Sequence, residues 1–184
     1  MEKSFMENLK NTFKNKLIIK PIIISFVVFV VAFFIGIYLN DVLFPYMSED
    51  MTLNRIGFLP ILKNNFLVCL LNIVLGIITF GIYGVISNIY NGVLLGITAG
   101  VATTKFGLRV ALLRLIPHAI FEIPTIIIST AYGIMTVYLI IRLVKKEKVD
   151  FKKLINQYLL VFVIMIILII LAAVVEGTVS MNLQ

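Results

Sequence analysis

A histidine and a glutamate stand four residues apart in one of the most apolar stretches of the chain. His118, the only histidine, and Glu122 lie within IPHAIFEIPTIIIST, residues 116–130. On an α-helix, side chains four residues apart share a face, so the two could form a hydrogen-bonded pair. The same face continues with further side chains that can hydrogen-bond: Thr125, Ser129, Tyr132 and Thr136. The rest of the circumference is apolar, so the sequence predicts a helix with one polar stripe.

The polar stripe cannot face lipid, because an ionisable side chain at the centre of a membrane helix costs about 2.5–3.5 kcal/mol on insertion scales. It must therefore face protein or water. Pro117 and Pro124 bracket the pair. Pro117 fits the first turn of a helix, whereas Pro124 would leave a carbonyl near residue 120 without its helical partner. Inside a bundle, that carbonyl would add another polar group to the same place.

Three interpretations of the His118 and Glu122 pair stay open at the level of sequence. The pair could be a hydrogen-bonded lock between neighbouring helices, or a site that responds to protons or ions, since burial and a nearby imidazole shift a carboxyl in opposite directions. A zinc site is the third interpretation, but it lacks further ligands and a His-Glu-x-x-His pattern. Cys69 is the only cysteine and cannot form a multi-thiolate site. We therefore expect no metal, no cofactor and no catalytic residues.

The composition is that of an integral membrane protein. Hydrophobic residues make up 61% of the 184 residues, charged residues 14%, and the mean hydropathy is +1.10. An ordinary soluble domain has roughly 45–50% apolar residues. The net charge of +7 does not indicate nucleic-acid binding, because the basic residues stand in short clusters beside long apolar runs.

Apolar runs of membrane-spanning length predict an all-α bundle of about five transmembrane helices in a single domain, residues 21–184. A basic amphipathic segment, residues 1–20, precedes it and is expected to lie on the inner membrane surface. The first run is not a signal peptide by this interpretation, because no small-residue cleavage site follows it. Residues 106–116 are too short and too charged to span, so we expect an interfacial helix there. The predicted spans are residues 21–39, 66–83, 84–103, 117–142 and 154–176.

Basic residues near the ends of the predicted spans set an orientation, since Lys and Arg favour the cytoplasmic side. Five basic residues precede the first span and six lie between residues 142 and 153, whereas five lie on the opposite side. This distribution of eleven against five predicts an N-terminus inside and a C-terminus outside. The expected location is the cell membrane, crossed several times.

Two further spans carry polar or small side chains at helical spacing. In the second span these are Asn65, Cys69, Asn72, Gly76, Thr79 and Tyr83. In the third they are Gly84, Asn88, Gly92, Gly96 and Gly100, with Asn91 beside them. Buried asparagines bridge helices, and glycines at intervals of four let two backbones approach closely in lipid. A longer helix to Asn88 followed by a re-entrant half-helix is an alternative for this region. Glu176 is either a second acid of the polar site or a side chain at the outer interface.

Several of these elements together resemble the stage II sporulation protein M family of polytopic membrane proteins, over roughly residues 60–178. They are Lys-Asn-Asn at 63–65, Tyr-Asn-Gly at 90–92 followed by Gly96, Pro-His-Ala-x-Phe-Glu-x-Pro at 117–124, and Ala-Ala-Val-Val-Glu at 172–176. Many relatives have glycine at the position of Ala119. This difference affects how closely the helices pack and not the chemistry of the site.

The resemblance implies a non-enzymatic membrane component. The namesake of the family holds peptidoglycan-degrading partners at the membrane during endospore engulfment, and relatives accompany export systems, including those for circular bacteriocins. We therefore expect a scaffold for partner proteins, or alternatively a transport, secretion or immunity component. The expected partners are the lipid bilayer, membrane or export proteins and, as a further alternative, a second copy in a homo-oligomer. An intramembrane hydrolase is disfavoured, since no nucleophile and base stand at a recognisable spacing.

Overall fold

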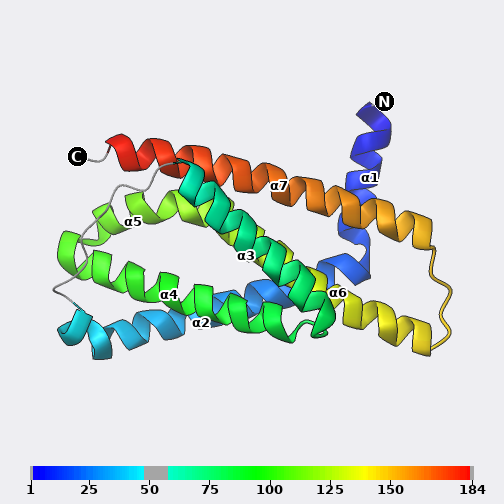
Figure 1. Cartoon of the computed structure of the whole chain (residues 1–184), viewed down its shortest axis with the longest axis horizontal. Coiled ribbons are helices and arrows are strands. Elements are labelled where there is room, and N and C mark those ends of the chain that lie inside the picture. Colours follow the sequence, from blue (N-terminus) through cyan, green and yellow to red (C-terminus); the bar gives the residue numbers. More distant parts are fainter. Residues whose placement is uncertain (1, 48–57, 183–184) are drawn as a thin grey trace.

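The protein is a bundle of long helices arranged along one axis, with α3 crossing the others obliquely (Figure 1). The computed structural model describes residues 2–47 and 58–182, and within these ranges every regular element is a helix, as the sequence predicted. The elements are α1 Glu2–Lys14, α2 Lys16–Met47, α3 Phe58–Ile78, α4 Ile82–Phe106, α5 Leu108–Pro117, the π-helix η1 His118–Glu122, α6 Ile123–Val144 and α7 Phe151–Asn182.

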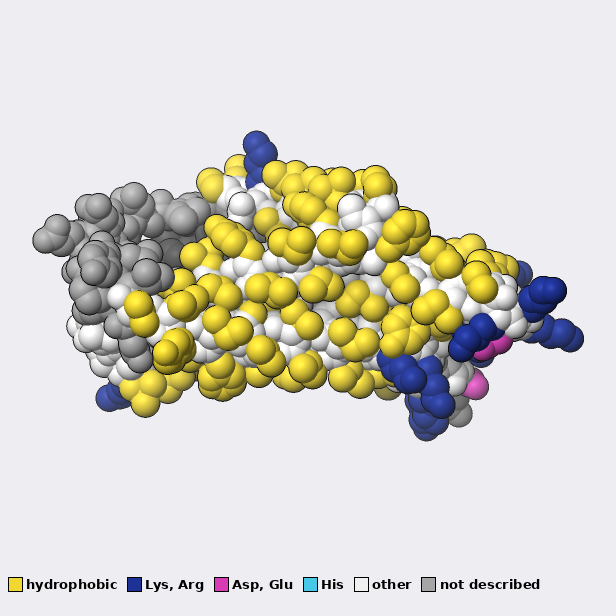
Figure 2. Space-filling model, turned by 90° about the horizontal axis from the view of Figure 1, so that it is seen from below, with side chains coloured by type: hydrophobic (Ala, Val, Ile, Leu, Met, Phe, Trp, Pro, Cys, Tyr) yellow, Lys and Arg dark blue, Asp and Glu magenta, His cyan; other side chains and the backbone are white. Residues whose placement is uncertain are grey.

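Within the described ranges, four helical segments are long and apolar enough to cross a membrane. They are Lys16–Asn40, Ile82–Phe106, Ile120–Val144 and Phe151–Val175. Leu62–Ile78, in α3, is apolar but shorter. Apolar side chains cover most of the visible face between the two ends, while Lys and Arg gather mainly at one end (Figure 2). This surface is typical of a protein whose middle lies in hydrocarbon.

The first long helix begins earlier than residue 21, where the sequence analysis placed its start. Asn15 stands between α1 and α2, and its Oδ1 accepts a hydrogen bond from the backbone N–H of Leu17 at 3.0 Å. That is the geometry of a helix N-cap, so α2 starts at Lys16. Similarly, α7 begins at Phe151 and ends beyond the predicted span of residues 154–176. Residues 48–57, between the first two predicted spans, lie outside the described residues.

The hairpin between α3 and α4 turns at residues 79–81, not between Tyr83 and Gly84 as predicted. Gly81 has a φ of 88° and precedes α4, and Phe80 also has a positive φ of 52°. Glycine adopts this left-handed conformation without steric cost, which explains why the chain reverses here. The alternative of one helix continuing to Asn88 is wrong, because α4 already starts at Ile82 and runs for 25 residues.

Glycines bring α2 and α4 together as a parallel pair. A Cβ added to Gly92 would lie 2.8 Å from the Cβ of Ala32, and one added to Gly96 would overlap the carbonyl oxygen of Phe33. Further along, a Cβ at Gly100 would lie 2.6 Å from the Cγ of Asn40. The two backbones therefore approach as closely as glycine permits, the packing mode expected in lipid.

The fourth glycine of the predicted series, Gly84, faces a different helix. A Cβ there would meet the Cα of Thr130 in α6 at 3.4 Å, an ordinary contact distance. On α6 itself, Ala131 and Met135 are fully buried, and they pack with Ile18 of α2 and Val161 of α7. α6, which directly follows Glu122, is thus enclosed by its neighbours along its first half.

Candidate functional site

The chain passes into α6 through a single π-helical turn, His118–Glu122. The sequence analysis predicted one continuous α-helix from residue 117. Pro124 explains the difference, since it has no N–H to donate to the carbonyl four residues earlier and stands within the first two positions of α6. Wider π turns relieve such a mismatch and are frequent at functional sites. The turn places Glu122 at the junction of two helices, directly before α6.

Glu122 and Asn91 line two adjoining cavities, a larger one between α2, α4 and α6 and a smaller one between α3, α4 and α6. The larger holds about 180 Å³ and also includes Thr98, whereas the smaller holds about 20 Å³. The smaller cavity has room for about one water molecule. Polar side chains from three helices surround these spaces, and we call them the Glu122 cluster: Asn64, Asn65, Asn91, Thr98, Glu122 and Thr125.

Short hydrogen bonds within single helices hold two members of the Glu122 cluster. The Thr125 hydroxyl donates to the carbonyl oxygen of Glu122 at 2.7 Å, and Asn91 Nδ2 donates to the carbonyl oxygen of Ser87 at 2.7 Å. Asn65 differs, because its Nδ2 is buried and has no hydrogen-bond partner in the part of the chain that the structure describes. A buried amide without a partner is costly, so this group is available to a polar guest in the smaller cavity.

Asn72 and Ser129 join α3 to α6 in the centre of the bundle. Asn72 Nδ2 donates to the Ser129 hydroxyl at 3.1 Å, and that hydroxyl donates to the carbonyl oxygen of Ile126 at 2.9 Å. Both side chains are completely buried. Cys69, almost one turn before Asn72, is also buried and lines the smaller cavity. The polar faces predicted on the second and fourth spans therefore do meet.

Asn88 lies apart from that contact. Its Nδ2 donates to the carbonyl oxygen of Ser25 in α2 at 2.8 Å, so it bridges α4 to α2. A separate bridge joins α6 to α4, since the Thr130 hydroxyl donates to the carbonyl oxygen of Gly84 at 3.2 Å. The sequence predicts Asn88 and Asn91 in one intramembrane polar site with His118 and Glu122, together with Asn72, Thr125 and Ser129. The structure instead directs Asn88 to α2, while Asn91 lines the cavities with Glu122.

His118 and Glu176 belong to the predicted site, but their side chains lie outside the part that the structure describes. Their backbones are placed: His118 begins η1, which packs against α7, and Glu176 lies within α7. Among the described side chains, no three of the types His, Cys, Asp and Glu come together as a metal site requires. The described residues support hydrogen bonding and the binding of a small polar molecule.

Sequence reasoning missed several members of these contacts. Asn64 was not considered as a site residue, and Asn65 was noted only as part of a polar face, although both line the cavity with Glu122. The spacing of Asn65, Cys69 and Asn72 was the available signal. No signal pointed to the carbonyl oxygen of Ser25, because a backbone group becomes a partner only when two helices pack against each other.

Comparison with known protein families shows which family this chain belongs to. Residues 24–181 match Stage II sporulation protein M, which is most of the chain. The chain belongs to the stage II sporulation protein M family. The matched range includes every member of the Glu122 cluster, as well as α2 to α6 in large part or completely.

Two archaeal members of this family are similar to the chain over most of their length. Uncharacterized protein MJ0706 of Methanocaldococcus jannaschii is 30% identical over 196 aligned residues, covering 96% of this chain and 87% of that protein. Uncharacterized protein MJ0793 of the same organism is 34% identical over 167 residues, covering 85% and 91%. No solved structure matches the chain.

Proposed function

We propose that this family member is a non-enzymatic membrane scaffold, a rigid bundle on which partner membrane or export proteins assemble. The proposal rests on the hydrogen bonds that buried polar groups make between helices. Asn72, Asn88 and Thr130 each donate to a group on another helix. Such bonds fix the relative positions of helices within lipid, where no hydrophobic drive holds them together. A fixed outer shape is what a docking platform needs.

The proposed topology has five crossings. α3, which lies between α2 and α4 in the sequence, supplies the fifth crossing. It is apolar over Leu62–Ile78 and runs obliquely across the bundle (Figure 1). Because tilting reduces the depth that a helix spans, the shorter apolar part of α3 would cross with the help of flanking residues that snorkel to the interface or of local thinning of the bilayer. The end that carries Lys145 and Lys153 lies inside by the positive-inside rule. The N-terminus is then inside and the C-terminus outside, in the cell membrane.

A double-mutant cycle on Asn72 and Ser129 tests the scaffold. The unfolding free energies of wild type, Asn72→Ala, Ser129→Ala and the double variant are measured in detergent. We expect a coupling free energy of about 0.6–2 kcal/mol between the two side chains. The same variants are used to co-purify partner proteins from membranes. Partner recovery should fall together with stability, since the scaffold acts through its fixed shape.

The control cycle pairs Asn72→Ala with Thr98→Val. The Thr98 hydroxyl donates only within its own helix, to the carbonyl oxygen of Leu94 at 2.9 Å. That cycle should show no coupling beyond about 0.3–0.5 kcal/mol. Destabilised variants that still recovered every partner at wild-type levels would refute the scaffold.

A proton- or ion-responsive site is the second candidate function, and the adjoining cavities at Glu122 favour it. A carboxyl beside amides and hydroxyls from three helices could bind a small cation or exchange a proton. In that case purified protein in liposomes should show pH-dependent flux that Glu122→Gln abolishes. Glu147→Gln, which removes a carboxyl outside the cluster, should leave the flux unchanged. Equal flux from Glu122→Gln and wild type would exclude this role.

A further inference from the structure

A large basic cavity lies where α1, α2, α6 and α7 meet, at the end of the bundle where α6 passes to α7. It holds about 740 Å³, which is within the range of small-molecule sites. Seven basic side chains line it against two acidic ones, a formal excess of +5. The basic residues are Lys14, Lys16, Lys20, Arg142, Lys145, Lys148 and Lys153, and the acidic ones are Glu147 and Asp150.

Both carboxylates of the basic cavity already have partners. Glu147 accepts a hydrogen bond from Arg142 Nε, an ion pair whose side chains are 39% and 42% exposed. Asp150 Oδ1 accepts from the backbone N–H of Lys153 at 3.0 Å and so caps the first turn of α7. Of the described residues that line the cavity, the lysines have no ion pair of their own. The positive charge is therefore not neutralised from within.

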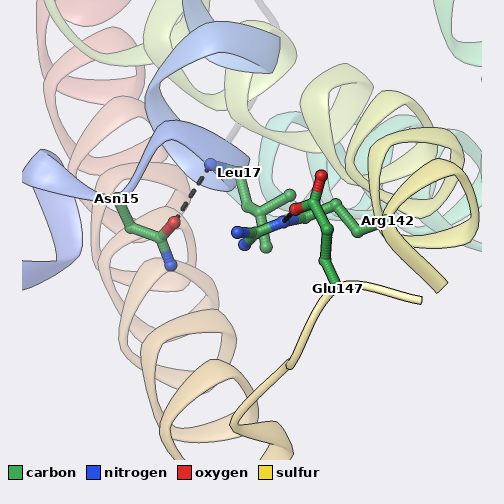
Figure 3. Close-up of polar contacts among 4 residues, drawn as sticks. All are labelled: Asn15, Leu17, Arg142 and Glu147. Carbon is green, nitrogen blue, oxygen red and sulfur yellow. Dashed lines mark hydrogen bonds and ion pairs between the residues drawn. The ribbon is translucent and has the colours of Figure 1, made fainter. Parts of the chain in front are cut away.

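Hydrogen bonds hold the walls of the basic cavity in place. Asn15 Nδ2 donates to Gln157 Oε1 at 2.6 Å, which ties the junction of α1 and α2 to α7. The backbone N–H of Glu147 donates to the carbonyl oxygen of Arg142 at 3.0 Å, so the connection folds back onto α6. Figure 3 shows two contacts from separate segments, Asn15 with Leu17 and Arg142 with Glu147, and all four residues line the same cavity. An orientation signal needs only basic residues near a span, whereas here four segments converge on one shaped space.

The position and chemistry of the basic cavity indicate its ligand. Two candidate spans, Ile120–Val144 and Phe151–Val175, meet at this end, so the cavity opens at the level of the membrane surface. Ammonium and guanidinium groups bind phosphate oxygens through short charge-assisted hydrogen bonds. We propose that the basic cavity binds a phosphate-bearing anion, either the headgroup of an acidic phospholipid or a soluble phosphate compound. This site is separate from the Glu122 cluster and does not depend on the scaffold function.

The test uses the full chain in phosphatidylcholine nanodiscs, with two probes. Phosphatidylglycerol added to the nanodiscs represents the lipid source, and inorganic pyrophosphate in solution represents the soluble source. Native mass spectrometry or the rise in melting temperature follows binding, which should saturate. Lys14→Gln with Lys145→Gln should raise the half-saturating concentration about tenfold or more, because each lysine close to a phosphate contributes roughly fivefold.

A matched pair, Lys10→Gln with Lys146→Gln, removes the same charge from α1 and from the same connection without touching the lining. This pair should change half-saturation by about twofold or less. If Lys14→Gln with Lys145→Gln lowers the melting temperature without probe, Lys20→Gln with Lys148→Gln replaces it with the same expectation. Saturable binding of either probe supports the site and identifies its source. The proposal would be overturned if the lining pair and the matched pair weakened probe binding equally. It would also be overturned if neither probe showed saturable binding.

Discussion

The Glu122 cluster and the basic cavity lie near opposite ends of α6, about 30 Å apart along its axis by the rise of an α-helix. The cavities of the cluster hold about 180 and 20 Å³ and have one carboxyl among neutral polar groups. The basic cavity holds about 740 Å³ and collects nine charged side chains, seven basic and two acidic. Water can solvate charges in the large open cavity but has little room in the small spaces between packed helices, so charge is cheap at one place and costly at the other.

The two regions also differ in what keeps them in shape. Around the Glu122 cluster, the helices are held by close backbone contacts at glycines and by buried hydrogen bonds such as that of Asn72. At the basic end, the caps formed by Asn15 and Asp150, the bond from Asn15 to Gln157 and a partly exposed ion pair hold the segments. We therefore expect substitutions in the buried region to cost far more stability than substitutions at the basic end.

The largest effect is expected for Gly96→Ala. Its Cβ would overlap the backbone oxygen of Phe33, which cannot move without separating α2 from α4. We expect a loss of about 3 kcal/mol or more in unfolding free energy, measured by denaturant titration in detergent. Gly84→Ala is the control, because its nearest neighbour is an ordinary 3.4 Å away, and it should cost less than about 1 kcal/mol. Equal losses at the two glycines would contradict the close α2 and α4 contact.

An intermediate effect is expected for Asn15→Ala. The change removes both the N-cap of α2 and the bond to Gln157, so unfolding free energy should fall by about 1 kcal/mol. Hydrogen exchange should show the loss in the first turn of α2. Asn11→Ala, on α1 beside the same cavity, should be nearly neutral. If the two asparagine variants behaved alike, the junction of α1 and α2 would not depend on this cap.

The smallest effect is expected for Glu147→Gln. Its ion pair with Arg142 is about two-fifths exposed, and such pairs contribute only about 0–1 kcal/mol. The melting temperature should change by no more than about 2–4 °C, in contrast to the buried glycine. A large loss of stability would mean that the basic end is as rigidly held as the Glu122 cluster.

Much of the architecture could be predicted from the sequence because lipid imposes simple requirements. Runs of apolar residues long enough to span, and a helix that places Glu122 among isoleucines, follow from composition and periodicity alone. The spacing of Gly92, Gly96 and Gly100 likewise predicted a close helix contact. The sequence could not say which helix would be met, and α2 is the answer.

Other features were beyond prediction because they depend on local strain and on partners distant in sequence. Pro124 signalled a disturbance near residue 120, but only the structure converts it into a π-helical turn. The turn at Gly81 was placed too late because Gly84 looked equally suitable. Asn88 and Asn91 stand three residues apart, yet one reaches α2 and the other lines the cavity with Glu122.

By itself the sequence determined that this chain is an all-helical membrane protein with polar groups that must avoid lipid. That much follows from residue type and spacing along one chain. The tertiary structure alone decided which polar groups meet and how large a space they enclose. It also assembled one basic cavity from α1, α2, α6 and α7, since such a space exists only after separate helices have packed.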